Sequence, residues 1–333
     1  MLKLRALIIL LMANSTKSST LSNVSVGKKE LINLAIFLLV LYAVIPQIGK
    51  FKDSFNVIKH ANFEWIALAL GLMVGTVFVF SIIIQLLAKR RLLFRRTLAV
   101  QTASLFVNRL LPGGVGSLGL NFEYLRHSKH NQAAAGAVVA SSSLIGFLGH
   151  IILFASAVPA SGASLAVFAG FHIDKSYYWG LLVVAIIILA VVIVLKWSKK
   201  LRNEIFTVLI GALKNIRGYR THPLKLGGAI VASIGLTSLY TFCLLACAYA
   251  VGVHLSFGQI LIVLTIGVIG STIAPTPGGL IGAEAGLFAG LVAFKVSGAQ
   301  ALAIVLVYRF LTYWLALAFG AVAWAFISRR DYI

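Results

Sequence analysis

Two glutamates stand out among the few acidic side chains of this sequence of 333 residues. Only eight Asp and Glu residues are present, and Glu123 and Glu284 are the two that do not lie at span ends or in loops. A carboxylate at membrane depth is costly unless it faces a polar cavity or a cation, so it marks a functional site by default. Arg109 and Arg309 are the candidate cationic partners. A structural salt bridge that ties the halves together is the alternative interpretation.

Clusters of proline and glycine precede both glutamates. They contain Pro112, Gly113, Gly114 and Gly116 in one case, and Pro275, Pro277, Gly278, Gly279 and Gly282 in the other. Proline removes a helix hydrogen bond and adjacent glycines weaken what remains, so residues 97–125 and 257–296 should each form two half-helices joined by an irregular turn. The N-terminus of a half-helix points unpaired N–H groups into the interior, which suits a phosphate group. Proline and glycine that merely end helices are the alternative.

The composition indicates a membrane protein. Hydrophobic residues make up 60% of the chain and charged residues only 11%, and the mean hydropathy is +0.99. A water-soluble enzyme is therefore nearly excluded. A helix needs about 20 apolar residues to cross the hydrocarbon core. Stretches of this kind predict spans over residues 31–48, 64–88, 133–158, 177–197, 226–251 and 299–327.

The spans and the two broken regions predict an all-α polytopic membrane protein with six transmembrane helices plus two re-entrant helical hairpins. Each half has the order span, span, hairpin, span, with opposite orientations in the membrane, which is the inverted repeat of many transporters. The first membrane repeat covers residues 31–158 and the second covers residues 177–327, including an amphipathic interfacial helix over residues 203–217. Residues 1–30 are expected to form a disordered cytoplasmic tail.

The positive charges predict the orientation. The chain has 29 Lys and Arg residues, and most of those outside the spans fall in segments on one side of the membrane once the spans are placed. Because positively charged loops stay in the cytoplasm, both termini are expected there, in a multi-pass protein of the plasma membrane. The basic inner face should attract anionic lipid headgroups, and no nucleic acid partner is expected.

Aromatic side chains flank Arg309. They are Tyr308, Tyr313 and Trp314. They are expected either to line a pocket for a lipid headgroup or to act as ordinary anchors at the membrane interface.

Signals for catalysis are weak. The serines at 141–143 and His150 supply a nucleophile and a base, but no G-x-S-x-G elbow is present, so helix packing is the favoured interpretation. Cys243 and Cys247 share a helix face without metal-site spacing. No catalytic residue, metal or other cofactor is expected.

Residues 108–116, Asn-Arg-Leu-Leu-Pro-Gly-Gly-Val-Gly, and residues 275–284, Pro-Thr-Pro-Gly-Gly-Leu-Ile-Gly-Ala-Glu, resemble a known family. The chain is similar to the lysylphosphatidylglycerol synthase transmembrane region, the flippase half of multiple peptide resistance factors, from about residue 30 onward. The resemblance implies movement between leaflets of lipids with modified polar headgroups, glycolipid carriers among them. The family's aminoacyl-transferase activity belongs to a soluble domain that follows the membrane part, so synthesis of lysyl-lipid is not expected here.

The favoured function is a lipid flippase or scramblase for phospholipids with aminoacylated or glycosylated headgroups. An integral-membrane enzyme or accessory subunit acting on a lipid-linked phosphate or sugar is the alternative, with a glutamate as general base in the enzyme. The partners are anionic or aminoacylated membrane phospholipids, and a homo-oligomer is left open. The candidate substrate-binding residues are Asn108, Arg109, Pro112, Gly113, Gly114, Gly116, Glu123, Pro275, Pro277, Gly278, Gly279, Gly282, Glu284, Tyr308 and Arg309.

Overall fold

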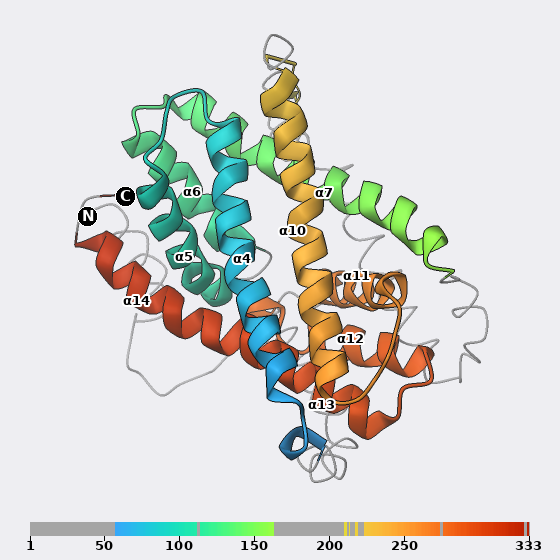
Figure 1. Ribbon diagram of the computed structural model, residues 1–333. Coiled ribbons are helices and arrows are strands. Elements are labelled where there is room, and N and C mark those ends of the chain that lie inside the picture. The colour runs from blue at the N-terminus through green and yellow to red at the C-terminus, as the bar shows by residue number, and fades with distance from the viewer. Residues whose placement is uncertain are drawn as a thin grey trace, which may run out of the picture. The chain divides into compact units, whose positions relative to one another are not determined.

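The computed structural model describes residues 57–111, 114–162, 210–211, 213, 217–218, 223–273, 276–329 and 332. All of them belong to one compact unit, residues 47–333. The regular elements in this part of the chain are all helical (Figure 1), as predicted: α4 (Phe63–Leu87), α5 (Phe94–Leu110), α6 (Val115–His127), α7 (Gln132–Ala160), α10 (Pro223–Ala250), α11 (Phe257–Ile273), the 3₁₀ turn η5 (Pro277–Gly279), α12 (Gly282–Ala293), α13 (Gly298–Arg309), the π-helical segment η6 (Phe310–Leu315) and α14 (Ala316–Ser328).

Four predicted spans are confirmed as long apolar helices. α4, α7, α10 and the continuous stretch Gly298–Ser328 are each long and apolar enough to cross a membrane. They correspond to the spans predicted over 64–88, 133–158, 226–251 and 299–327. The predicted spans 31–48 and 177–197, the predicted tail 1–30 and most of the predicted interfacial helix 203–217 lie outside the described residues.

α4 and α10 run antiparallel and so define two ends of the bundle. At one end the Asn62 N–H, just before α4, donates to the Ala250 carbonyl at the end of α10 over 2.8 Å. Toward the other end, a Cβ placed on Gly228 near the start of α10 would lie 3.4 Å from the Leu86 side chain near the end of α4. We call these the Asn62 end and the Leu86 end.

The first proline-glycine region is broken into two helices, as predicted. The Thr97 and Tyr124 hydroxyls lie 2.8 Å apart, and one turn further along the Gln101 Nε2 donates to the Asn121 Oδ1 over 2.6 Å. Residue numbers rise on α5 while those of their partners fall on α6, so the two helices form an antiparallel hairpin. The Gln85 Nε2 near the end of α4 donates to the Thr97 hydroxyl over 3.1 Å. The hairpin therefore starts and finishes at the Leu86 end.

The second proline-glycine region is also broken into two helices, α11 and α12. These two helices pack against each other at glycine residues. A Cβ on Gly270 would lie 2.2 Å from the Gly282 carbonyl oxygen, and a Cβ on Gly286 would lie 2.6 Å from the Ile266 carbonyl oxygen. Such close backbone approach, with small residues four apart on α12, is typical of helix pairs in membranes. The two helices are antiparallel because these contacts also run in opposite directions along them.

This second hairpin starts and finishes at the Asn62 end. α11 follows the end of α10 after the short connection 251–256, and Gln300 at the start of α13 lines a pocket together with Asn62 and Ala250. The two hairpins thus begin at opposite ends of the α4–α10 pair.

We predict that Gly286→Ala destabilises the protein because the added Cβ meets the Ile266 backbone, which cannot rotate away as a side chain would. Overpacking of this kind costs about 1–3 kcal/mol. Gly146→Ala on α7 is the matched control, because its Cβ would have nothing within 4 Å. Thermal unfolding of the purified protein in mild detergent measures the difference. Equal melting temperatures for the two variants would contradict the close packing of α11 against α12.

Candidate functional site

The turn of the second hairpin rests on the last part of α5. Gly278 has φ +62, and a Cβ there would lie 2.5 Å from the Tyr313 ring and 3.1 Å from the Arg109 Cγ. Only glycine therefore allows this turn to lie so close to both residues. Arg109 lies near the end of α5, three residues before Pro112. The turn of the α11–α12 hairpin therefore contacts the α5–α6 hairpin close to its own turn.

Glu284 and Arg309 form an ion pair behind this turn. The Arg309 Nε donates to the Glu284 Oε1 over 2.6 Å, with the side chains 14% and 28% exposed respectively. The other carboxylate oxygen, Oε2, accepts a hydrogen bond from the Ile281 N–H. Ile281 has φ +77, a strained value for a β-branched residue. Both oxygens of Glu284 are therefore engaged, and the carboxylate holds the strained start of α12 in place.

Arg109 bonds to a break in the last apolar helix. Its Nη2 donates to the Thr312 carbonyl and its Nη1 to the Leu105 carbonyl, the latter over 3.1 Å. Thr312 lies in the π-helical segment η6. In a regular α-helix the Ala316 N–H would donate to the Thr312 carbonyl, but here it donates to the Tyr313 carbonyl. The irregular helix thus presents a carbonyl to the arginine, in agreement with the frequent occurrence of π segments at functional sites.

The Tyr313 ring lies close to both guanidinium groups. Its centroid is 5.0 Å from the Arg309 Cζ and 6.0 Å from the Arg109 Cζ, within the range of cation–π attraction. Among the described residues, ion pairs join Arg309 to Glu284 and Arg126 to Glu123, and Arg109 has no carboxylate partner in this part of the chain. Two guanidinium groups and one carboxylate give the cluster a net positive charge.

A cavity of about 190 Å³ adjoins Arg109. It is bounded by α4, α5, α6 and α10, and Thr76 places it near the middle of α4. Its lining residues are Thr76, Val77, Phe80, Gln101, Ser104, Leu105, Asn108, Arg109, Ser117, Leu236 and Tyr240. Seven of these have side chains with hydrogen-bonding groups, an unusual proportion for the centre of so apolar a bundle.

Two of the residues that line this cavity each have a buried side-chain atom without a hydrogen-bond partner. They are the Asn108 Oδ1, an acceptor, and the Arg109 Nε, a donor. Buried polar atoms normally have partners, since leaving one without costs about 1–3 kcal/mol.

The other predicted site residues divide into three groups. Glu123 lies on an exposed part of α6, where it pairs with Arg126 over 3.9 Å, and it does not line the cavity. Tyr308 is buried in the largest hydrophobic cluster, beside Cys243 and Cys247. The remaining residues shape the turns.

Gly114 caps the start of α6 with φ +77, and Gly116 lets α6 approach α5, since a Cβ there would lie 2.3 Å from the Val107 carbonyl oxygen. Gly279 has φ +67, and a Cβ on it would lie 2.7 Å from the Ser271 Cβ. Pro112, Gly113 and Pro275 lie outside the described residues, and Pro277 begins η5.

Two cavity residues of α5, Gln101 and Ser104, are not among the predicted site residues, although the sequence contains a signal for them. Gln101, Ser104 and Asn108 follow one another at spacings of three and four. That spacing places the three polar side chains on one face of the helix. The polar periodicity of α5, rather than its charge alone, therefore predicts this face. The role of the Thr312 carbonyl has no comparable signal, because it depends on the local π geometry.

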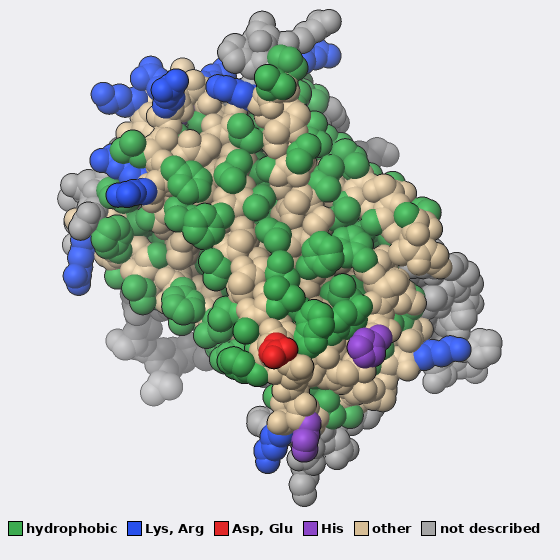
Figure 2. Space-filling view, in the orientation of Figure 1, with side chains coloured by type: hydrophobic (Ala, Val, Ile, Leu, Met, Phe, Trp, Pro, Cys, Tyr) green, Lys and Arg blue, Asp and Glu red, His purple; other side chains and the backbone are tan. Residues whose placement is uncertain are grey.

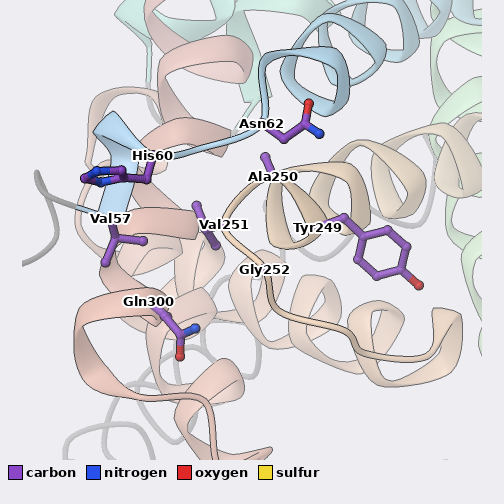
Figure 3. Close-up of a pocket in the computed structure, with 8 residues that line it drawn as sticks. All are labelled: Val57, His60, Asn62, Tyr249, Ala250, Val251, Gly252 and Gln300. Atoms are coloured by element: carbon purple, nitrogen blue, oxygen red, sulfur yellow. The ribbon is translucent and has the colours of Figure 1, made fainter.

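A second pocket, of about 410 Å³, lies at the Asn62 end. Figure 3 shows its lining residues, with His60 and Gln300 on two sides of it. The Asn62 side chain accepts from the Glu64 N–H and so caps α4. Among the described residues that line this pocket there is no Asp, Glu, Lys or Arg, and we do not assign it to the site.

The residues considered for catalysis do not come together. The hydroxyls of Ser142 and Ser143 both donate to the Val139 carbonyl of their own helix, while the His150 Nε2 lies 3.1 Å from the Thr265 hydroxyl on α11. Within the described ranges, no group of three or more His, Cys, Asp or Glu side chains is placed to hold a metal ion.

A comparison with protein families finds a match over most of the chain. The family model of the lysylphosphatidylglycerol synthase TM region matches residues 31–320, which is most of the chain. The chain belongs to this family. The match spans both hairpins and includes Arg109, Glu284 and Arg309. A comparison with curated proteins finds no match. Membership of the family makes this chain a multi-pass membrane protein.

We predict that Glu284 and Arg309 are energetically coupled. Glu284→Gln or Arg309→Gln alone leaves one charge without its partner in a largely buried place, whereas the double variant removes both charges. The double variant should therefore be more stable than the sum of the single losses implies, by about 1–3 kcal/mol. Thermal unfolding of all four proteins in detergent gives the coupling. Losses that simply add would mean that the ion pair contributes nothing.

Proposed function

We propose that this protein is a lipid flippase or scramblase that moves phospholipids with modified polar headgroups, aminoacylated or glycosylated, between membrane leaflets. The family to which the chain belongs includes the flippase half of multiple peptide resistance factors, which supports transport. The observation that carries the proposal is the positively charged cluster of Arg109, Arg309 and Glu284 beside a polar cavity in the middle of an apolar bundle. Ionisable groups at such a depth typically mark a substrate pathway.

The proposed architecture has six transmembrane helices plus two re-entrant hairpins in an inverted repeat, residues 31–158 and 177–327. The hairpins α5–α6 and α11–α12 start from opposite ends of the α4–α10 pair, and Gly278 contacts Arg109 between them. This supports entry from opposite faces of the membrane toward one shared region, as in transporters whose binding sites lie between repeats.

The proposed orientation places both termini in the cytoplasm, at the plasma membrane. Figure 2 shows that most Lys and Arg side chains on this face gather at the Leu86 end, with apolar side chains across the middle. Five cations, Lys89, Arg90, Arg91, Arg95 and Arg96, directly follow α4 at this end. The positive-inside rule then assigns the Leu86 end to the cytoplasm.

In the proposed mechanism the headgroup passes through the polar cavity while the acyl chains stay in the bilayer. A polar headgroup cannot cross the hydrocarbon core unaided because it would lose its hydrogen bonds to water. Polar side chains on α5, α6 and α10 replace that water on the way. Each hairpin offers the headgroup an approach from a different leaflet, and no covalent step is needed.

The test is lipid movement in proteoliposomes. Purified protein is inserted into phosphatidylcholine vesicles that hold phospholipids labelled on an acyl chain, and a membrane-impermeant reductant measures how much label reaches the outer leaflet. We expect the protein to accelerate movement over protein-free vesicles, and Arg109→Gln to slow it by about tenfold or more, the value of one charged hydrogen bond.

Arg126→Gln is the matched control, because Arg126 is an exposed arginine outside the cavity, and it should retain the wild-type rate. Vesicles with folded wild-type protein in which lipid moves no faster than without protein would refute the proposal. Recovery of a lipid with an altered mass would instead favour the enzyme hypothesis.

A further inference from the structure

A row of paired polar side chains joins α5 to α6 between the cavity and the Leu86 end. At its inner end the Gln101 Nε2 donates to the Asn121 Oδ1 over 2.6 Å, and the Asn121 Nδ2 donates back to the Gln101 Oε1 over 3.5 Å. One turn nearer the Leu86 end, the Thr97 and Tyr124 hydroxyls lie 2.8 Å apart. Gln85, near the end of α4, donates to the Thr97 hydroxyl over 3.1 Å. The row therefore extends from the cavity to that end of the bundle.

The Gln101–Asn121 pair closes the cavity on its Leu86 side. Gln101 is one of the residues that line the cavity, and the other lining residues of α5 and α6 begin one turn further from the Leu86 end, at Ser104 and Ser117. The Asn121 Nδ2 also donates to the Ser117 carbonyl over 2.8 Å, so the pair lies directly against the cavity. Gln101 and Asn121 are only 1% and 3% exposed. A headgroup in the cavity can therefore reach the Leu86 end along this hairpin only if the two amides separate.

Packing alone does not require carboxamides at these two positions. Two buried polar side chains that bond to each other contribute little more to stability than apolar side chains of the same shape. A carboxamide differs from an apolar side chain because it has both donor and acceptor groups, and it carries no charge. When the pair separates, each amide can bond to a polar group that lies between them, and no charge is left without a partner. The passage of a polar headgroup needs this property.

α6 is the arm of the hairpin that is free to move. Among the described helices α5 packs against α4, α6 and α14, whereas α6 packs mainly against α5 and α7. A segment with few packing partners has a low free energy of local opening. α6 also begins after Gly114, which has φ +77, and contains Gly119, where a Cβ would meet nothing within 4 Å. A movement of α6 away from α5 separates the amide pair and the hydroxyl pair together.

We propose, on the basis of the transport function above, that Gln101 and Asn121 form a gate for the polar headgroup between the cavity and the leaflet at the Leu86 end. The amide pair closes the gate in this structure. The gate opens when α6 moves away from α5, and the two amides then bond to the headgroup as it passes. Because the amides are neutral donors and acceptors, the gate admits anionic and aminoacylated headgroups alike.

Access of a polar reagent to the cavity tests the gate without any need for transport. The full-length protein, with Cys243 and Cys247 replaced by alanine, carries Ser104→Cys in sealed vesicles of known orientation, and a negatively charged methanethiosulfonate is added on the Leu86 side. The paired substitution Gln101→Met with Asn121→Leu keeps the shape of the gate but removes its hydrogen-bonding groups. It should slow the labelling of position 104 by about tenfold or more, the value of one charged hydrogen bond.

Controls separate the polarity of the gate from its shape and its stability. The exchange Gln101→Asn with Asn121→Gln keeps both amides and should label as the wild type does. Ser128→Cys, which follows α6 outside the row, should label at one rate in every background. Thermal unfolding of each variant is measured first. If the apolar variant does not fold, Thr97→Val with Tyr124→Phe decides the case, because it removes the polar groups of the second pair at nearly constant shape.

Lipid movement in the vesicles described above gives a second measurement. The apolar gate variant should move labelled phospholipids about tenfold more slowly than the wild type does. The exchanged pair should retain the wild-type rate. Thr265→Val is the matched control, because it removes a hydroxyl that lies 3.1 Å from the His150 Nε2 between α7 and α11, outside the row. It should also retain the wild-type rate.

Each outcome separates the gate from the transport function. Equal labelling of position 104 in the wild type and the apolar variant overturns the gate even if the protein moves lipids. Labelling that is equally slow in the exchanged pair also overturns it, because shape and not polarity would then control access. Labelling that slows only in the apolar variant, in a protein that moves no lipid, supports the gate and overturns the transport function. Slower labelling with unchanged lipid movement overturns the gate as the route of the headgroup.

Discussion

The constraint on which this structure depends is that broken helices in an apolar bundle must find partners for their backbone groups. The Gly278 carbonyl lies 3.5 Å from the Arg309 Nη2, the Ile281 N–H donates to Glu284, and the Thr312 carbonyl accepts from Arg109. The same three charged side chains therefore stabilise the breaks and create the polar centre. Their cost in an apolar setting explains why they are so few and why they lie together.

Glycine residues allow the broken helices to pack with their backbones close together. Along α11 and α12, Gly270, Gly286 and Gly290 allow the two backbones to approach closely, and Gly278 fits between Arg109 and Tyr313. α5 and α6 combine close packing at Gly116 with polar pairs such as Gln101 and Asn121. The first hairpin thus adds hydrogen bonds to close packing, and the cavity opens beside it.

Much of the fold could be predicted because hydropathy and helix breaking are local properties. The spans of α4, α7, α10 and Gly298–Ser328 follow from apolar length, and both hairpin breaks follow from proline and glycine. Positions of side chains across the bundle could not be predicted in the same way. Glu123 and Glu284 follow similar motifs, yet one pairs with Arg126 at the surface and the other with Arg309 inside, because helix rotation is set by distant packing.

The central claim is that the two hairpins enter the membrane from opposite faces. It is tested most directly by cysteine accessibility in sealed vesicles of known orientation, with Cys243 and Cys247 replaced by alanine. Ser128→Cys follows α6 at the finish of the first hairpin, and Ser297→Cys follows the second. A membrane-impermeant maleimide should label position 128 only from the cytoplasmic side and position 297 only from the opposite side. Labelling of both positions from the same side would contradict the claim.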